Sequence, residues 1–304
     1  MQFTINNLNL NLLVNLHALL EEQSVSRAAD RMFLSQSAMS DALARLRDFF
    51  NDDLFIHIGK TMVPTPLAQS LVQPVRDVLI QVQAISSATI HFDPLKTTRR
   101  VRFMSSDYIA RVLLTRVLPR LSQEAPSMTI ELLQFNEHYM EEFNKGHLDL
   151  LTCPEEFASD EHPTALLYEE SFKCVAWSKN RLIGKKLTVD QYFSLGHVCV
   201  NFGEWRVPTY VAHFLTRYGK APRRVEVTVP NFGTEIGVIT GTNRIATVHR
   251  RHAEMFARQY SLKLLDPPFD IPPMKMVLQW HKFMDKEPSL VWLRNLILSV
   301  AKEI

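Results

Sequence analysis

The chain has 304 residues, of which 46% are hydrophobic, and its formal net charge is +2. That length allows two or three domains with ample cores, and so small a charge says little about partners. No run is long enough to cross a membrane, and the first residues lack the basic segment and cleavage site of a secretory signal. Cys153, Cys174 and Cys199 are odd in number and widely spaced, which favours reduced thiols over disulfides. We therefore expect a cytoplasmic protein.

The segment from Leu8 to Thr65 has the pattern of three short helices and a hairpin. One helix ends near Glu22, a second opens at 24–29, a third opens at 35–40, and 55–64 looks like a small hairpin. Three short amphipathic helices in this order form a compact unit whose third helix can enter a DNA major groove. We expect residues 1–65 to be a winged helix-turn-helix domain, with the rest of the chain supplying control.

The third helix has one apolar face and one polar face. The apolar residues recur at helical spacing and are expected to pack on the first two helices: Ala38, Met39, Ala42, Leu43, Leu46 and Phe50. Ser35 is a good N-cap, because its hydroxyl can accept an orphan amide of the first turn. Short polar side chains at a helix start suit contact with base edges, and Gln36 can pair bidentately with adenine.

Arginines on the same unit suit phosphate contacts, which position a protein on DNA without specifying sequence. The set expected to bind DNA is Ser26, Arg27, Ser35, Gln36, Ser37, Ser40, Asp41, Arg45, Arg47 and Lys60. An alternative stays open, in which these are simply the solvated side of an amphipathic helix. Residues 1–64 carry five Arg or Lys against seven Asp or Glu. Since phosphate neutralisation supplies much of DNA affinity, a lone domain should bind weakly.

Residues 66–88 read as a long linker helix that Thr65 caps and Pro66 begins. Its apolar side chains are spaced close to the 3.5-residue period of a coiled-coil seam: Leu67, Leu71, Val75, Val78, Val82 and Ile85. We expect this stripe to pair with a second chain, with packing against its own chain as the alternative. Pro74 should bend the helix. Residues 89–98 read as a hinge.

From Arg99 onward, expected strands and helices alternate. Strands are expected at 100–105, 128–134, 148–153, 172–177, 197–201, 224–229, 245–247 and 274–280. Helices are expected at 108–124, 139–145, 188–195, 209–218, 232–240, 249–257 and 289–302. This alternation predicts a mostly parallel sheet covered by helices.

Ligands of open α/β sheets bind beyond the carboxyl ends of the strands and at domain clefts. This rule nominates a set of residues that follow expected strands: Ser105, Ser106, Asp107, Phe135, Asn136, Cys153, Pro154, Asn201, Phe202, Gly203, Thr247, Val248 and His249. Phe232 can add to an apolar wall. The mixture suits a small aromatic or otherwise apolar ligand with a few polar handles. Asp107 could equally cap the helix that follows it.

Enzymatic motifs are absent from the sequence. There is neither a phosphate-binding glycine loop nor a dinucleotide fingerprint. His249 and His252 lie one helical turn apart, but Arg250 and Arg251 between them disfavour a cation, so we expect no metal and no cofactor. A nucleophilic Cys153 would need a base that the sequence does not identify. A solute-binding module for transport and an α/β hydrolase or reductase remain the alternatives to a DNA-binding regulator.

Residues 1–88 resemble, position by position, the N-terminal region of the LysR-type bacterial transcription regulators. The segments that carry the resemblance are 8–13, 26–29, 34–40, 45–47, 53–55 and 64–66. Later segments, 223–232, 244–248, 280–281 and 292–294, with Pro288, look like the branch that contains nodulation regulators and regulators of aromatic-compound breakdown. Two positions depart from the family pattern: Ser37 stands where Pro is usual, and His57 where the wing often carries Arg.

The resemblance implies an α+β multidomain protein. Residues 99–304 would form two α/β subdomains like a periplasmic solute-binding protein, subdomain I at about 99–167 and 270–304 and subdomain II at about 168–269. The chain would cross over near 164–170 and return near 268–273, which adds Glu170 and Met274 to the effector-binding residues. The function implied is a non-enzymatic, DNA-binding activator that responds to a small aromatic effector. It would assemble as a dimer or tetramer and contact RNA polymerase.

Overall fold

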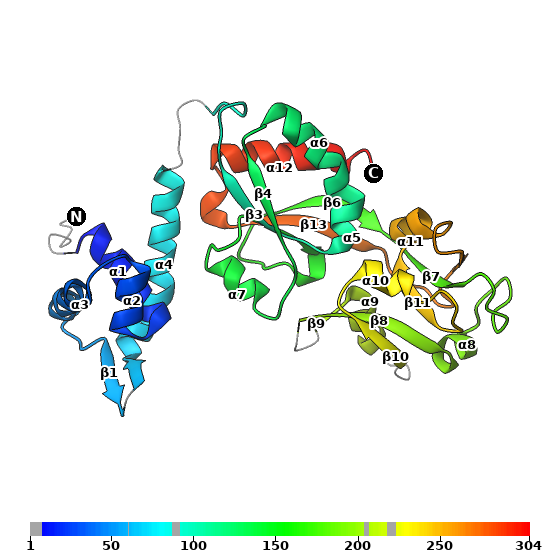
Figure 1. Ribbon diagram of the computed structural model, residues 1–304, viewed down its shortest axis with the longest axis horizontal. Helices are drawn as coiled ribbons and strands as arrows, with labels where there is room; N and C mark the ends of the chain where they lie inside the picture. Colours follow the sequence, from blue (N-terminus) through cyan, green and yellow to red (C-terminus); the bar gives the residue numbers. More distant parts are fainter. Residues whose placement is uncertain (1–7, 60, 87–91, 204–206, 218–222) are drawn as a thin grey trace. The chain divides into compact units, whose positions relative to one another are not determined.

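The computed structural model describes residues 8–59, 61–86, 92–203, 207–217 and 223–304 (Figure 1). The chain divides into two compact units, residues 1–88 and 89–304. We call the first the N-terminal head and the second the C-terminal unit.

The head contains the expected helices and hairpin. In order, they are α1 (Leu10–Glu22), α2 (Val25–Arg31), α3 (Gln36–Phe50), β1 (Phe55–Ile58), β2 (Thr61–Pro64) and α4 (Pro66–Ser86). β1 and β2 pair antiparallel around a turn in which Gly59 has a φ of +64°. The helix starts follow from side-chain caps, since the oxygens of Asn9, Ser24 and Ser35 accept the backbone N–H of Leu12, Arg27 and Ala38.

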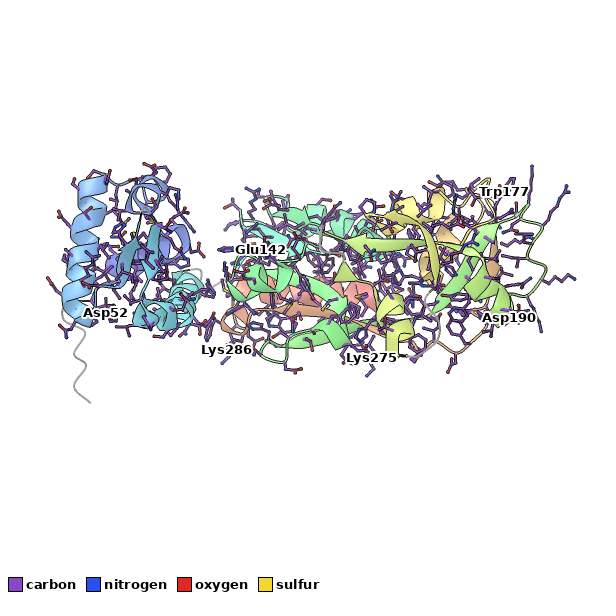
Figure 2. The ribbon with its side chains drawn as sticks, turned by 90° about the horizontal axis from the view of Figure 1, so that it is seen from below. Asp52, Glu142, Trp177, Asp190, Lys275 and Lys286 are labelled. Atoms are coloured by element: carbon purple, nitrogen blue, oxygen red, sulfur yellow. The ribbon has the colours of Figure 1, made fainter. Side chains whose placement is uncertain are left out.

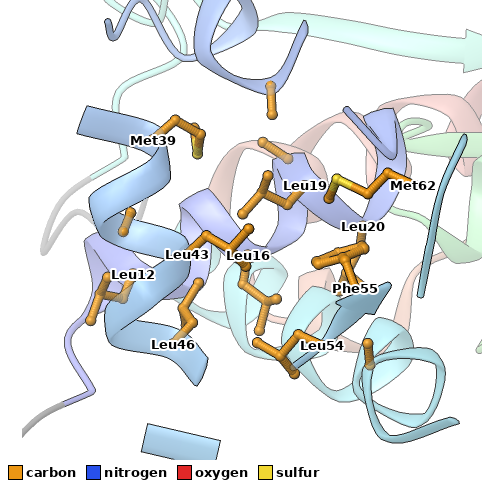
Figure 3. Close-up of a cluster of buried hydrophobic side chains, with 14 of the residues drawn as sticks. Leu12, Leu16, Leu19, Leu20, Met39, Leu43, Leu46, Leu54, Phe55 and Met62 are labelled. Carbon is orange, nitrogen blue, oxygen red and sulfur yellow. The ribbon is translucent and has the colours of Figure 1, made fainter. Parts of the chain in front are cut away.

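Leucines and methionines of α1, α3 and the hairpin form the core of the head (Figure 3). Leu16, Leu19, Met39 and Leu46 have no exposed surface. The expected apolar face of α3 is therefore confirmed at Met39, Ala42, Leu43 and Leu46, which are buried, and at Phe50, which is half-buried. Ala38 is exposed, which corrects the expectation that it packs on the first two helices.

The apolar stripe of α4 is divided between two environments. Val75 is buried and Leu71 is half-buried against the core of the head, where α4 packs on α1. Val78 and Ile85 are 40% and 72% exposed. Packing against its own chain therefore accounts for one side of the stripe. The exposed side chains form a separate apolar edge that the head leaves uncovered.

The C-terminal unit contains two sheets, and we call each sheet with its helices a lobe. The first lobe has the strand order β4-β3-β5-β13-β6, and the second has β10-β8-β11-β7-β12 with β9 beside β8. The first-lobe strands are β3 (Arg100–Met104), β4 (Thr129–Leu133), β5 (Leu150–Pro154), β6 (Thr164–Glu170) and β13 (Met274–Trp280). The second-lobe strands are β7 (Phe172–Trp177), β8 (Gly196–Phe202), β9 (Val207–Pro208), β10 (Arg224–Val229), β11 (Ile245–His249) and β12 (Leu262–Leu265).

Helices cover both sheets. Those of the first lobe are α5 (Asp107–Ile109), a π-helical turn (Ala110–Leu114), α6 (Thr115–Glu124), α7 (Tyr139–Asn144) and α12 (Pro288–Ala301), with short 3-10 turns at Glu155–Phe157 and Lys282–Met284. Those of the second lobe are α8 (Val189–Ser194), α9 (Tyr210–Arg217), α10 (Phe232–Gly237) and α11 (Arg250–Phe256). In Figure 2, Glu142 and Lys286 mark the first lobe, and Trp177 and Asp190 mark the far end of the second.

The sheets are mixed, which corrects the expectation of a mostly parallel sheet. β3 runs parallel to β4 and β5, but β13 is antiparallel to β5 and β6. The chain leaves the first sheet after Glu170 and enters β7 at Phe172, and it returns to the first sheet at Met274. β13 therefore enters from the side of the second lobe and runs against β5. Strands β6, β9 and β12 were not predicted from the sequence, nor was the π-helical turn within the expected helix at 108–124.

Candidate DNA-binding and effector sites

An open groove of about 470 Å³ lies on the head between the start of α2, the start of α3 and the hairpin. Ser26, Arg27, Gln36 and Ser40, all expected to bind DNA, line this groove. The remaining lining residues are Gln23, Ser24, Val25, His57, Thr61 and Met62. The sequence analysis did not nominate these, although the hairpin pattern could have indicated His57 and Thr61.

The exposed flank of α3 is available to a large partner. Gln36, Ser37, Ser40 and Asp41 are all exposed, as is Arg45 one turn further along. Ser35 caps the helix, and its Oγ lies 2.9 Å from the Ser37 Oγ. Because the first turn of α3 carries short hydroxyl side chains, the helix is narrow at the end that would meet the base edges. The geometry of α3 therefore fits a helix that enters a major groove.

Two of the arginines expected to touch phosphate are engaged within the head. The Arg47 Nε and Nη2 donate to the backbone oxygens of Asp53 and Phe55 at 2.7 and 3.1 Å, which fixes the entry to the hairpin. Arg27 donates to the Glu22 carbonyl, and its Nε lies 3.5 Å from the Glu22 carboxylate. Arg27 is still 64% exposed. Lys60 lies outside the described residues.

A second cavity lies between the two lobes of the C-terminal unit. Its volume is about 60 Å³, against about 470 Å³ for the open groove. The first lobe lines it with Ser106, Tyr108, Phe135, Tyr139, Thr152, Cys153, Pro154, Phe157, Met274 and Met276. The second lobe lines it with Phe202, Thr209, Tyr210, Phe232 and His249. We call it the aromatic cavity.

The rings of the aromatic cavity contact one another across the lobes. Phe202 lies 5.6 Å, centroid to centroid, from both Phe135 and Phe232. Tyr108 stacks on His249 at 3.9 Å with an interplanar angle of 10°. Such ring pairs stabilise a fold by more than the burial of their surface area alone provides. The cavity is therefore a preformed aromatic cage whose walls come from both lobes.

The lining is electrically neutral. It contains no Lys, Arg, Asp or Glu among the residues that the structure describes. Burial lowers the pKa of His249 to about 3 and raises the pKa of the Cys153 thiol to about 12, so both are uncharged at neutral pH. The same raised pKa makes Cys153 a poor nucleophile.

The residues nominated for effector binding divide between the cavity and its supports. Eight of them lie in the lining: Ser106, Phe135, Cys153, Pro154, Phe202, Phe232, His249 and Met274. Thr247 lines only a smaller adjoining cavity. Outside both linings are Ser105, Asp107, Asn136, Glu170, Asn201, Gly203 and Val248. Seven lining residues were not predicted: Tyr108, Tyr139, Thr152, Phe157, Thr209, Tyr210 and Met276. Most of these lie in helices or inside strands, which the end-of-strand rule does not reach.

The polar residues outside the linings are used in structural contacts. The Ser105 Oγ accepts a hydrogen bond from the Thr152 hydroxyl at 2.8 Å, and Asn136 accepts the backbone N–H of His138. Glu170 is fully buried, accepts from the Tyr108 hydroxyl, and lies 3.2 Å from the Arg251 guanidinium. Its carboxylate is thus held by one residue from each lobe.

Asp107 joins the lobes directly. Its two carboxylate oxygens accept the backbone N–H of Phe232 at 3.0 Å and of Gly233 at 2.7 Å. These amides are the first of α10, where a negative charge is favourable. The carboxylate therefore caps a helix of the opposite lobe and not its own helix, which Ser106 caps.

The described part of the chain offers neither a metal site nor a membrane-spanning helix. It contains no group of three or more His, Cys, Asp or Glu side chains that could hold a metal ion. Nor does any described helix combine the length and apolarity needed to cross a bilayer.

Comparison with known proteins identifies both units. Residues 10–69 match the family described as bacterial regulatory helix-turn-helix protein, lysR family, and residues 96–302 match the LysR substrate binding domain. The chain is 40% identical over 294 residues to nodulation protein D 1 of a Bradyrhizobium species, which covers 97% of this chain and 93% of that protein. It is 38% identical over 297 residues to nodulation protein D 1 of Rhizobium tropici, covering 98% and 96% of the two chains.

Solved structures agree. A probable transcriptional regulator from Pseudomonas aeruginosa superposes with a TM-score of 0.64 at 26% identity, covering 96% of this chain and 97% of that one. A full-length OxyR variant from the same species gives a TM-score of 0.71 at 16% identity, covering 97% and 95%, and supports the fold alone. Members of this family are transcription regulators, not enzymes. The chain therefore belongs to the LysR family of transcriptional regulators, with an N-terminal DNA-binding domain and a C-terminal effector-binding domain.

Proposed function

We propose that this regulator is an activator whose promoter binding is retuned when an uncharged aromatic molecule occupies the aromatic cavity. In this proposal Gln36 and Ser40 read base edges, while Arg27 and Arg45 hold phosphates. Dimers, or tetramers built from them, would place two heads on one operator and bring RNA polymerase to the promoter. The activator role and the polymerase contact rest on the resemblance to the family, not on a contact in this chain.

The proposed class of ligand rests on the neutrality of the cavity lining. A carboxylate or an amine buried there would lose its hydration without gaining an opposite charge, which is strongly unfavourable. An aromatic ring, in contrast, gains burial and ring contacts with Phe135, Phe202 and Phe232. The cage should therefore select aromatic ligands without charge.

Domain roles follow the two compact units. We propose that residues 1–65 bind DNA, that 66–88 pair the chains through the exposed edge of α4, and that 89–98 act as the hinge. The two lobes of 99–304 would then bind the effector. The exposure of Val78 and Ile85 supports the pairing role of α4.

Two measurements on the full chain test this function. In a gel-shift assay with DNA from upstream of its own gene, we expect retardation at low salt that weakens steeply as salt rises. By calorimetry, β-naphthol should bind at least about tenfold more tightly than β-naphthoate. Absence of any retardation would contradict the DNA-binding role. Tighter binding of the naphthoate anion would contradict the neutral cavity.

A further inference from the structure

A smaller cavity continues from the aromatic cavity into the second lobe. The two share four lining residues, Thr209, Tyr210, Phe232 and His249. Beyond them the smaller cavity is lined by residues of β7, β8, β11, α9 and α10 and by Arg223, which directly precedes β10: Phe172, Cys199, Val200, Val211, Arg223, Glu235 and Thr247. The Tyr210, Phe232 and His249 rings thus line both spaces, so a ligand that contacts them in the aromatic cavity lies next to the smaller one.

Polar groups in the smaller cavity are buried without partners. Glu235 is only 3% exposed, and its Oε2 has no hydrogen-bond partner in the structure. The Nδ1 of His249, a residue 5% exposed, also has none. Buried polar atoms are nearly always hydrogen-bonded, so each exception needs an explanation. Two such atoms on the lining of one cavity indicate that a group from outside the chain completes them.

Arg223 lines the same space but does not neutralise Glu235 by direct pairing. Among the described residues, the two form no ion pair and no hydrogen bond, although the positive charge of Arg223 acts on the Glu235 carboxyl. Burial nevertheless raises the pKa of Glu235 well above its ordinary value, and the Asp107 charge raises it further, which favours the protonated carboxyl that can donate. The lining thus offers donors in Arg223 and Glu235 and an acceptor in a ring nitrogen of His249.

The size of the space limits what fits there. The volume open to the centre of a water-sized group is about 10 Å³, close to the minimum of roughly 10–15 Å³ that holds one water molecule. A carboxylate, with two oxygens, exceeds that room, whereas one hydroxyl oxygen fills it. A hydroxyl also matches the lining, because it can accept and donate at once.

We propose that this smaller cavity is a polar subsite of the effector site, which takes one hydroxyl oxygen of the aromatic ligand between Glu235, Arg223 and His249. The subsite rests on the proposed function, since the ring that carries the hydroxyl must lie in the aromatic cavity. It assigns the ligand a hydroxyl directed into the second lobe.

The test compares two probes that differ by one oxygen, β-naphthol and naphthalene, with the full-length wild type and two variants at Glu235. Wild type should bind β-naphthol about tenfold more tightly, as one well-placed buried hydrogen bond gives. Glu235→Leu should remove the preference by weakening naphthol binding while leaving naphthalene binding in place. Glu235→Gln keeps a donor and an acceptor, and should retain most of the preference. As a control, Phe157→Ala should weaken both probes alike, because Phe157 lines only the aromatic cavity.

Thermal unfolding separates the subsite from a structural role. An unpartnered buried acid destabilises the free protein, so Glu235→Leu should raise Tm by about 2–4 °C. A lowered Tm or an unfolded variant would show that Glu235 is structural and would overturn the subsite. Equal binding of both probes by wild type, or a preference that survives in Glu235→Leu, would overturn it too while leaving the aromatic cavity intact. Failure of wild type to bind either probe would instead refute the proposed aromatic effector, and the subsite with it.

Discussion

The groove on the head and the aromatic cavity gain their affinity in opposite ways. The groove is open and polar, and its Arg27 is partly neutralised by Glu22. The cavity is enclosed by rings and methionines and holds no charged side chain among its described lining residues. Binding in the groove therefore depends on phosphate charge, salt and the number of heads, whereas binding in the cavity depends on burial. In the proposed function, the head is thus a weak, salt-sensitive DNA reader and the aromatic cavity is a salt-insensitive effector site.

The largest expected effect comes from separating the two chains of a dimer. Val78→Asp places a charge on the exposed edge of α4 and should leave monomers, visible by sedimentation. Loss of the second head should weaken operator binding by about 100-fold or more, since linked sites gain that much through effective concentration. Binding of β-naphthol should not change. Gln69→Asp, on the opposite face of α4, is the matched control and should remain dimeric; an unchanged mass for Val78→Asp would refute the pairing role.

A pH change should affect the C-terminal unit more than the head. Burial lowers the pKa of His197 and His252 to about 4 and that of His249 to about 3, all in the C-terminal unit. The unfolded chain takes up protons near pH 6.5, but the folded unit does not. Stability is therefore complete above about pH 6.5 and falls as the pH approaches 4, by roughly 2 kcal/mol per histidine between pH 6.5 and 5.

Urea unfolding at pH 7 and pH 5 measures this slope. All four tryptophans, at positions 177, 205, 280 and 292, lie in the C-terminal unit, so their fluorescence reports on it alone. His252→Phe should reduce the difference between the two pH values by about 2 kcal/mol. The same difference in the variant and the wild type would show that His252 is not buried as an uncharged ring.

On the exposed flank of α3, base readout and phosphate contact should differ in how their loss depends on DNA sequence. Gln36→Ala should cost about 1–3 kcal/mol on the operator and little on scrambled DNA. Arg45→Ala should weaken binding to both DNAs alike and reduce the salt slope by about 1. Fluorescence anisotropy on the two DNAs measures both effects. Equal losses for Gln36→Ala on operator and scrambled DNA would contradict its role in reading bases.

The smallest expected effect tests how much the acidic residues of the head weaken its binding to DNA. Glu22→Gln removes a carboxylate that lies beside both Arg27 and Arg31, although the Glu22 backbone carbonyl still accepts from Arg27. The charge of the two guanidinium groups then becomes more available to phosphate. Affinity for any DNA should rise by about 3–5-fold at low salt, since an exposed ion pair contributes less than about 1 kcal/mol. Asp30→Asn removes the same charge from an exposed position without a contact to Arg27, and should raise affinity less. Equal gains would point to overall charge and not to the release of Arg27.

The head was the more predictable region because its signals are local. The Ser35 cap, the buried Met39 and the exposed Gln36 all follow from one helix and its periodicity. Arg47 shows the limit of such reasoning, because its guanidinium is used by backbone oxygens brought near only when the hairpin folds. The same limit applies to α4, whose evenly spaced stripe did not reveal that Val75 would be covered and Val78 exposed.

The effector domain was predictable at the level of its elements and less so in its contacts. Several residues after strand ends reached the cavity, as with Phe135, Pro154 and Phe202. Two acidic residues did not, because Asp107, from the end-of-strand rule, and Glu170, from the family resemblance, found amide and guanidinium partners across the lobes. The direction of β13 depends on a return from the other lobe, which local periodicity does not encode.

Phe232 lies both in the lining of the cavity and at a hydrogen bond that joins the two lobes. Its ring lines both cavities, while its backbone N–H is one of the two that Asp107 holds. Because the ring and the amide belong to the same residue, a ligand bound against the ring would lie next to one of the hydrogen bonds that hold α10 to the first lobe. The Gly233 amide and the Glu170 carboxylate provide further links between the lobes, so occupancy could change one link while the others keep the lobes together.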